Sequence, residues 1–165
     1  MILVNRPRIS RYIAGLYLAI ILFVAGETAL LIYVLPQSLL KFLVAVVLAA
    51  IEDVLILLLI SIYRTKYIIT GNELIIKATK LIGGSKRIRL EDIISAERTL
   101  IPFSIRLLGA SLYGGYHYIP GLGRAFMTMT NFNDGVLLRT VHGNYIITPR
   151  EPERFIENIN AMRGC

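Results

Sequence analysis

The sequence is poor in the residues on which most catalytic and metal sites depend. It has one cysteine, the last residue Cys165, and two histidines, His117 and His142. One cysteine forms neither an internal disulfide nor a cysteine-based metal site, and a terminal Gly-Cys lacks the three residues that follow a prenylated cysteine. Neither histidine has a nucleophile or a carboxylate at a catalytic spacing. We therefore expect no enzyme activity, no metal and no cofactor.

Long apolar runs, by contrast, dominate the first third of the chain. Residues 12–35 and 39–63 are almost free of charge and are separated only by Pro36-Gln37-Ser38. A helix of 24 residues is about 36 Å long, which exceeds a hydrocarbon core of about 30 Å. A cleaved signal peptide does not explain the pattern, because the first run is too long and a second follows at once. The sequence predicts a transmembrane helical hairpin over residues 12–63.

Basic residues flank this hairpin at both of its outer ends. They are Arg6, Arg8 and Arg11 before it, and Arg64 and Lys66 after it. The connecting turn has no Lys or Arg, so the positive-inside rule predicts that both termini lie in the cytoplasm and that the chain crosses the cell membrane twice. Lys41, just after the turn, is expected to extend its ammonium group to the outer interface.

The charge balance favours an anionic partner. The chain carries a formal charge of +7, and residues 64–165 contain fourteen Lys and Arg against eight Asp and Glu. This sign suits both nucleic acid and an anionic lipid surface, but a domain tethered to a bilayer has lipid as the nearer partner. We therefore expect the lipid bilayer, with anionic headgroups, as a partner, and no nucleic acid.

From residue 64 the pattern changes to short alternating runs between turn residues, which is typical of β-strands. The candidate strands are 67–70, 74–78, 86–90, 93–99, 124–131, 136–141 and 145–148. Glycine and asparagine at 71–72, 83–84, 133–135 and 142–144 suit the turns between them. The segment 101–123, rich in glycine and tyrosine, predicts a loose connection.

The last segment has helical periodicity. Thr148 and Glu151 have the spacing of a capping box, and Phe155, Ile159 and Met162 form one apolar stripe. About seven antiparallel strands followed by one helix predict a mainly-β barrel or sandwich capped by a C-terminal α-helix. The chain thus divides into a basic N-terminus (1–11), the hairpin (12–63) and a cytoplasmic domain (64–165).

Several motifs in this domain carry a family resemblance. They are T-G-N-E-L-I-I-K (70–77), I-R-L-E-D-I (88–93), G-A-S-L-Y-G-G-Y (109–116), Gly123-Arg124 with the strand after it, V-L-L-R-T (136–140) and Y-I-I-T-P-R-E-P-E-R-F-I (145–156). Their order resembles that of the prokaryotic pleckstrin-homology-like (PH-like) domains found on small membrane proteins, over about residues 64–162. The resemblance implies a PH-like barrel and no particular activity.

Three acidic residues, Glu27, Glu52 and Asp53, lie inside the predicted spans. An ionised acid facing lipid costs about 2.5–3.5 kcal/mol or more, and one hairpin is too thin to shelter three. Small residues, which permit close helix approach, lie at Gly15, Ala19, Gly26 and Ala29 and, beside Glu52, at Ala45 and Ala49. This pattern predicts self-association through protonated acids, a proton or cation path, or contact with another membrane protein.

A basic cluster surrounds the Gly83-Gly84 turn. It consists of Lys77, Lys80, Lys86, Arg87 and Arg89. Alternation with apolar neighbours places Lys77, Arg87 and Arg89 on one sheet face, where anionic headgroups or a protein partner could bind. The alternative is a solvated face that merely obeys the positive-inside rule.

The Gly/Tyr-rich segment has two readings of its own. Its glycines permit tight turns or bulges, and its tyrosines pack or lie at an interface. The alternative is a loop that binds a peptide or a partner. As a whole, the sequence predicts a membrane-anchored binding or assembly module, with a small oligomeric ion- or proton-conducting membrane protein as the other possibility.

Overall fold

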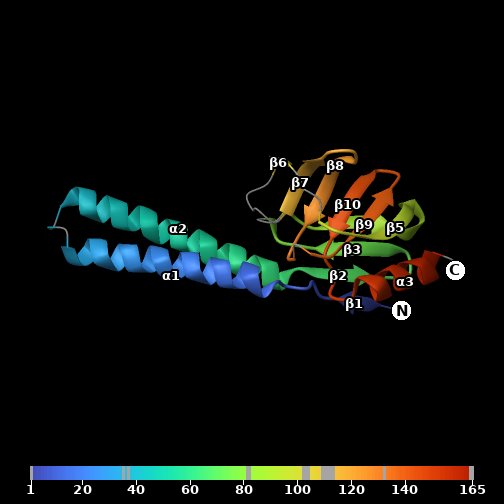
Figure 1. Ribbon diagram of the computed structural model, residues 1–165, viewed down its shortest axis with the longest axis horizontal. Helices are drawn as coiled ribbons and strands as arrows, with labels where there is room; N and C mark the ends of the chain where they lie inside the picture. The colour runs from blue at the N-terminus through green and yellow to red at the C-terminus, as the bar shows by residue number, and fades with distance from the viewer. Residues whose placement is uncertain are drawn as a thin grey trace. The chain divides into compact units, whose positions relative to one another are not determined.

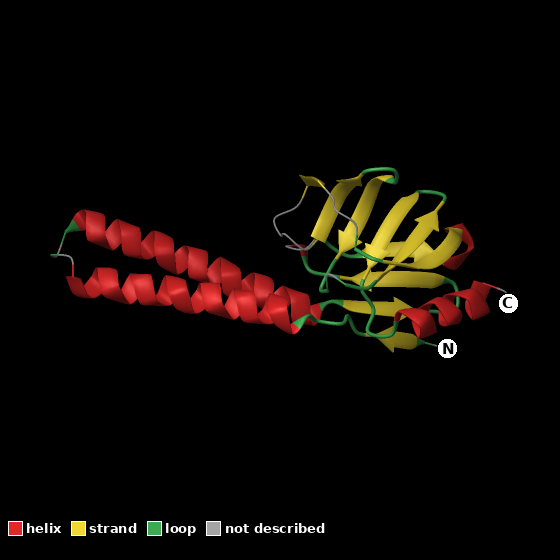
Figure 2. Ribbon diagram, in the orientation of Figure 1, coloured by secondary structure: helices red, strands yellow, loops and turns green. Residues whose placement is uncertain are grey.

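The computed structural model describes residues 2–34, 36, 38–80, 83–101, 105–108, 114–131 and 133–163 (Figures 1 and 2). Its helices are α1 (Arg11–Val34), α2 (Leu39–Arg64) and α3 (Pro152–Arg163), with a 3-10 turn, η2 (Leu90–Asp92). Its strands are β1 (Leu3–Asn5), β2 (Lys66–Ile69), β3 (Glu73–Lys77), β4 (Lys86–Arg89), β5 (Ile93–Thr99), β6 (Ile105–Leu108), β7 (Gly114–Ile119), β8 (Gly123–Thr128), β9 (Gly135–Thr140) and β10 (Gly143–Ile147). The chain forms two compact units, Arg11–Ile60 and Met1–Ser10 with Ser61–Cys165.

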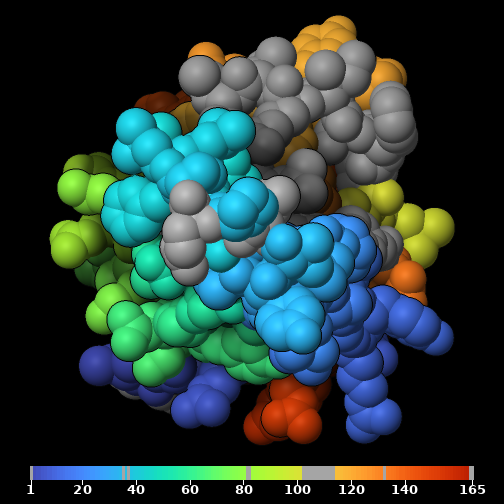
Figure 3. All heavy atoms as spheres, turned by 90° about the vertical axis from the view of Figure 1, so that its left-hand side faces the viewer, coloured from blue at the N-terminus to red at the C-terminus, as the bar shows by residue number. Residues whose placement is uncertain are grey.

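The first unit is a helical hairpin, and the prediction of two long apolar helices is confirmed. Both helices are long and apolar enough to cross a membrane, and they lie side by side (Figures 1 and 3). Ser38 caps α2, because the Lys41 N–H donates to Ser38 Oγ at 3.2 Å. Lys41 is buried, and its Nζ donates to the Ile32 carbonyl at 2.6 Å near the C-terminal end of α1.

The second unit contains ten residues from before the hairpin. β1 pairs antiparallel with β2, with Val4 opposite Ile68. The next residues run beside the segment after β10, where the Arg8 N–H donates to the Thr148 carbonyl at 3.0 Å and the Arg150 N–H to the Arg6 carbonyl at 3.0 Å. The hairpin is therefore inserted between the first strand of this domain and the second, which the sequence pattern did not indicate.

Two sheets make up this second unit. The first is four-stranded, in the order β1-β2-β3-β4, and the second is six-stranded, in the order β5-β9-β10-β8-β7-β6. The expectation of antiparallel strands is wrong at one place, since β10 pairs parallel with β8. The reason is topological: β10 folds back from β9 and enters between β9 and β8, which aligns it with β8.

The segment predicted as a loose connection contains strands. β6 and β7 lie within residues 101–123, and β7 pairs with β8 along its whole length. The prediction failed because Gly114 and Gly115 at the start of β7 hide its alternation. Residues 102–104 and 109–113, which include Gly109 and Tyr113, lie outside the described residues.

The two sheets share one core, so the predicted mainly-β sandwich with a C-terminal helix is confirmed. Side chains from both sheets bury Phe155 and Ile159 of α3, and Met162 packs against them, as the apolar stripe predicted. Tyr67 crosses the core from β2: its hydroxyl lies 3.3 Å from the Thr128 carbonyl and accepts the Thr148 N–H at 3.3 Å. Among the described residues the sheets do not close into a barrel.

The predicted capping box is wrong. The Thr148 hydroxyl accepts the Thr130 N–H at 3.0 Å and donates to the Thr128 carbonyl, so it belongs to the core beside Tyr67. Helix α3 begins only at Pro152, a residue favoured in a first helical turn. A capping-box spacing alone does not distinguish a helix cap from a strand-end threonine.

Candidate anion-binding face

The four-stranded sheet has one face turned away from the core, and its residues follow from the strand period of two. Tyr67, Ile69, Leu74, Ile76 and Ile88 point into the core. We call the opposite side the outer face. Its residues are Val4, Lys66, Ile68, Glu73, Ile75, Lys77, Arg87 and Arg89.

Strand register arranges the outer face in rows. The central row runs Val4–Ile68–Ile75–Arg87, because each residue lies opposite the next one on the neighbouring strand. On one side of this row Lys66 lies opposite Lys77, and on the other Glu73 lies opposite Arg89. The outer face therefore presents an apolar row that ends at Arg87, with two lysines on one side of it and a Glu–Arg pair on the other.

Three of the five cations in the predicted basic cluster lie together on this face: Lys77, Arg87 and Arg89. Arg89 has an acidic neighbour, since its Nη1 lies 3.2 Å from Glu91 Oε1 in an exposed ion pair. Lys80 is exposed in the loop after β3.

Lys86 points to the other side of β4. Its Nζ lies 5.2 Å from the ring centres of Tyr116 and Phe126, and the Arg124 guanidinium lies 4.2 Å from the centre of the Tyr116 ring. Burial, with a smaller effect from Tyr116, raises the pKa of the nearby Tyr145, while Lys86 lowers it. The grouping of Lys86 with Arg87 and Arg89 is therefore wrong: adjacent strand residues face opposite ways.

Three cations that lie near Lys77 are absent from the predicted basic cluster: Arg6, Arg64 and Lys66. Arg6 follows β1, and Lys66 begins β2; both line a hollow with Arg64, the last residue of α2, and with Lys77. Arg6, Arg64 and Lys66 were read only as orientation signals. The pairing of Lys66 with Lys77 could have been found by aligning the predicted strands 67–70 and 74–78 around their turn.

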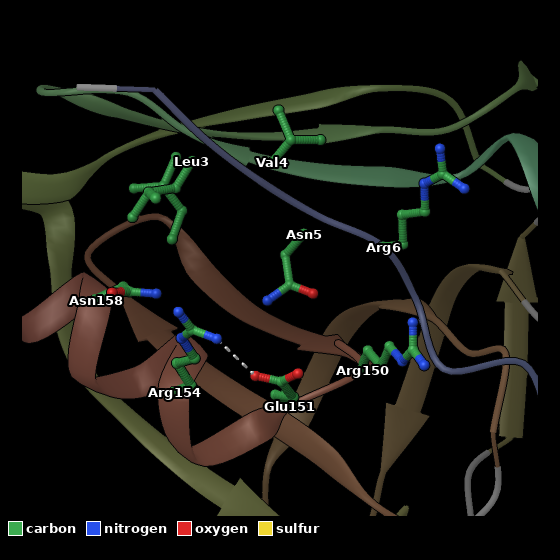
Figure 4. A pocket seen from close by; sticks show the side chains of 9 residues that line it. Leu3, Val4, Asn5, Arg6, Arg150, Glu151, Arg154 and Asn158 are labelled. Carbon is green, nitrogen blue, oxygen red and sulfur yellow. Dashed lines mark hydrogen bonds and ion pairs between the residues drawn. The ribbon is translucent and has the colours of Figure 1, made fainter.

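A second hollow lies between β1 and the start of α3 (Figure 4). It is lined by Arg6, Arg150 and Arg154 and also by the acidic residue Glu151. Arg154 Nη1 lies 3.3 Å from Glu151 Oε2. In Figure 4, the Arg6 side chain points away from this pair. The second hollow is thus partly neutralised by its own carboxylate.

A separate network of charged side chains links several elements of the domain. Arg98 pairs with Glu153 of α3 and, at 2.7 Å, with Asp134, which also lies 3.6 Å from Arg8. This network joins β5, the β8–β9 connection, α3 and the N-terminal segment.

The histidines lie apart. His142 Nε2 is 3.5 Å from Asp92 Oδ2 in an exposed turn, a pairing that sequence spacing did not indicate, and His117 is buried. In the described part of the chain, no three His, Cys, Asp or Glu side chains are placed to hold a metal. Cys165 lies outside it.

The acids of the hairpin are spread along it. Glu27 is exposed beside a hollow lined by Phe23 and Leu48, Glu52 is half-buried and Asp53 is exposed. The small residues Gly15, Ala19, Gly26 and Ala29 form a seam along α1. At Gly15 and Gly26 this seam does not contact α2, because Cβ atoms added there would meet no described atom within 4 Å. Any close helix approach through that seam would need a further helix.

Two sheets over one core, a C-terminal helix and a basic outer face define a β-rich domain, into whose sequence an apolar hairpin is inserted. A family model described as Bacterial PH domain matches residues 65–162. The match covers more than half of the chain, and the chain belongs to the bacterial PH domain family. No curated protein and no solved structure gave a significant match. Membership indicates a binding or assembly module, whose ligand must be argued from its own surface.

Proposed function

We propose that this protein is a binding module anchored by residues 12–63 in the cell membrane, with its PH domain (64–165, completed by β1) at the cytoplasmic face. There the outer face of the four-stranded sheet contacts anionic lipid headgroups. The observation that carries the proposal is the apolar row with Arg87 at its end and Lys66 and Lys77 beside it. Lys66 follows the end of α2 by only two residues.

The folding of the chain supports the topology. Residues before α1 and residues after α2 form one compact unit, so both must lie on the same side of any membrane that the hairpin crosses. The basic residues at both outer ends of the hairpin make that side the cytoplasmic one.

Electrostatics sets the strength of the lipid contact. Arg89 is offset by Glu91, and Glu73 on the same face offsets one further cation, so Lys66, Lys77 and Arg87 leave a net excess of two positive charges. Each net charge contributes about 1 kcal/mol near an anionic surface, within a Debye length of about 8 Å. About 2 kcal/mol favours the lipid-facing orientation by roughly thirtyfold. Because the anchor already holds the domain at the membrane, this attraction orients the domain and does not recruit it.

Topology is tested by labelling intact cells. With Cys165 replaced by Ser, Ser38→Cys should react with a membrane-impermeant maleimide, whereas Ile75→Cys should react only after permeabilisation. Labelling of Ile75→Cys in intact cells would show that the domain lies outside the cell and would contradict the proposed topology.

Lipid contact is tested on the full chain in nanodiscs, with an environment-sensitive fluorophore at Ile75→Cys in the centre of the outer face. Its emission should shift to the blue in anionic nanodiscs, return with added salt and fail to shift when Arg87 and Arg89 become Glu. The matched control is Val141→Cys, which is exposed in the β9–β10 turn of the other sheet and should not respond. An Ile75 label with the same emission in neutral and anionic nanodiscs would refute lipid contact and favour a protein partner.

Self-association of the hairpin is the second part of the proposal. The small-residue seam is open in the hairpin itself, and Glu27, Glu52 and Asp53 need shelter in lipid. A second copy of the chain would supply both. The conducting function remains the alternative, and it needs the same association.

A further inference from the structure

The hollow at the start of β2 is built from both ends of the inserted hairpin. It has a volume of about 540 Å³ and is lined by the cations Arg6, Arg64, Lys66 and Lys77 and by the hydroxyl-bearing Thr79 and Ser85. Arg6 comes five residues before α1 begins, and Arg64 is the last residue of α2. The two ends of the hairpin thus contribute cations to one site.

No lining residue carries a negative charge. None of the four cations forms an ion pair with a described residue. Lys66 also lies directly opposite Lys77, an arrangement of like charges that destabilises a sheet. The hollow in Figure 4 differs, because Glu151 there pairs with Arg154. An unbalanced concentration of positive charge in a concave surface favours a bound anion.

The wall of the hollow is held in place before any ligand arrives. The Ser85 hydroxyl bridges to Ala78, accepting its N–H at 3.3 Å and donating to its carbonyl at 3.0 Å. The Gly84 N–H donates to the Thr79 carbonyl at 2.9 Å. The Thr79 hydroxyl is buried without a hydrogen-bond partner in the described residues, an unfavourable state that a rotation of this side chain toward an anion would relieve.

We propose that this hollow is a phosphate-binding site. A phosphomonoester carries a charge of about −1.5 to −2 at neutral pH and three acceptor oxygens, which suits four cations better than a carboxylate with a single charge. By bridging Arg6 to Lys66 and Lys77, the phosphate ties together the two chain segments that enter and leave the hairpin. This inference rests on the proposed function, because the site becomes a headgroup site only if the hairpin crosses the membrane.

The test uses the full chain in a non-ionic maltoside detergent, which contains no phosphate. Thermal unfolding is followed by near-ultraviolet circular dichroism while inorganic phosphate is added. Phosphate should raise the unfolding temperature of the wild type. Lys66→Gln with Lys77→Gln should bind phosphate at least about tenfold more weakly, since each charged hydrogen bond is worth a factor of that order.

The double variant carries a second signature. Without phosphate it should unfold at a slightly higher temperature than the wild type, because the repulsion between the paired lysines is gone. The matched control, Arg139→Gln with Arg154→Gln, removes the same charge at exposed positions outside the hollow and away from the outer face, and its phosphate affinity should be unchanged.

The source of the phosphate is decided by a second titration, with phosphatidic acid in the same micelles. If phosphatidic acid stabilises the wild type at a lower concentration than inorganic phosphate does, the site binds a lipid headgroup. If inorganic phosphate acts at the lower concentration, the site binds a soluble phosphate. Equal losses of affinity in the two double variants, or no effect of phosphate on the wild type, would refute the site. Either result leaves the lipid contact measured at Ile75 standing, so the two proposals can fail separately.

Discussion

Replacement of Tyr67 by Phe tests how the two sheets are joined. The Tyr67 side chain is fully buried, and its hydroxyl reaches from the first sheet to Thr128 and Thr148 in the second. Phenylalanine keeps the ring, which packs edge-on against Phe155, and removes only the hydroxyl. The Thr148 N–H would then be buried without this partner, which costs about 1–3 kcal/mol.

The expected loss is therefore about 2 kcal/mol in the free energy of unfolding, or a fall of about 5–10 °C in unfolding temperature. Urea titration followed by near-ultraviolet circular dichroism measures it, because the tyrosines are the main reporters in a chain without tryptophan. Tyr145→Phe is the matched control: its ring is half-buried and its hydroxyl makes no hydrogen bond with a described residue, so its cost should stay below about 0.5 kcal/mol. Equal losses in the two variants would refute the proposed link between the sheets.

The same hydroxyl predicts a pH dependence. Burial raises the pKa of Tyr67 above the ordinary value of 10.0, although hydrogen bonds from Thr128 and Thr148 oppose the shift. The unfolded chain therefore loses the Tyr67 proton near pH 10, while the folded chain still holds it. Stability from this group is complete below pH 10 and is lost as the pH rises above it. The difference in stability between wild type and Tyr67→Phe should narrow there; a constant difference would contradict the assignment.

Two further predictions concern glycine and the hairpin. Gly83→Ala should destabilise the domain by about 1–3 kcal/mol more than Gly84→Ala in the same urea titration: both residues have positive φ, but only at Gly83 would a methyl group lie 2.9 Å from Phe126. Equal costs would show that backbone strain alone matters. Native mass spectrometry should find oligomers of the wild type that are weakened by Glu52→Leu and by Ala49→Phe; a monomeric wild type would exclude self-association.

Local sequence periodicity was sufficient to predict the helices and strands that bury one face or that are apolar along their whole length. The runs at 12–35 and 39–63 predicted α1 and α2 to within one residue, because only a helix satisfies its own backbone over such a length. Alternation predicted that Lys77, Arg87 and Arg89 share a face. The same rule separates Lys86 from Arg87, and grouping them by closeness in sequence was the error.

Pairings between distant segments could not be read in this way. The composition of residues 1–11 indicated a basic tail, yet β1 completes a sheet with strands some sixty residues later, and glycines concealed β7. Such pairings depend on the packing energy of the whole core, which no local pattern contains. The sequence by itself determined an apolar hairpin, a mainly-β domain and an excess of positive charge. Only the tertiary structure decided that Arg6 joins Lys66 and Lys77 in one hollow, because the pairing of β1 with β2, and not spacing along the chain, brings this arginine to the two lysines.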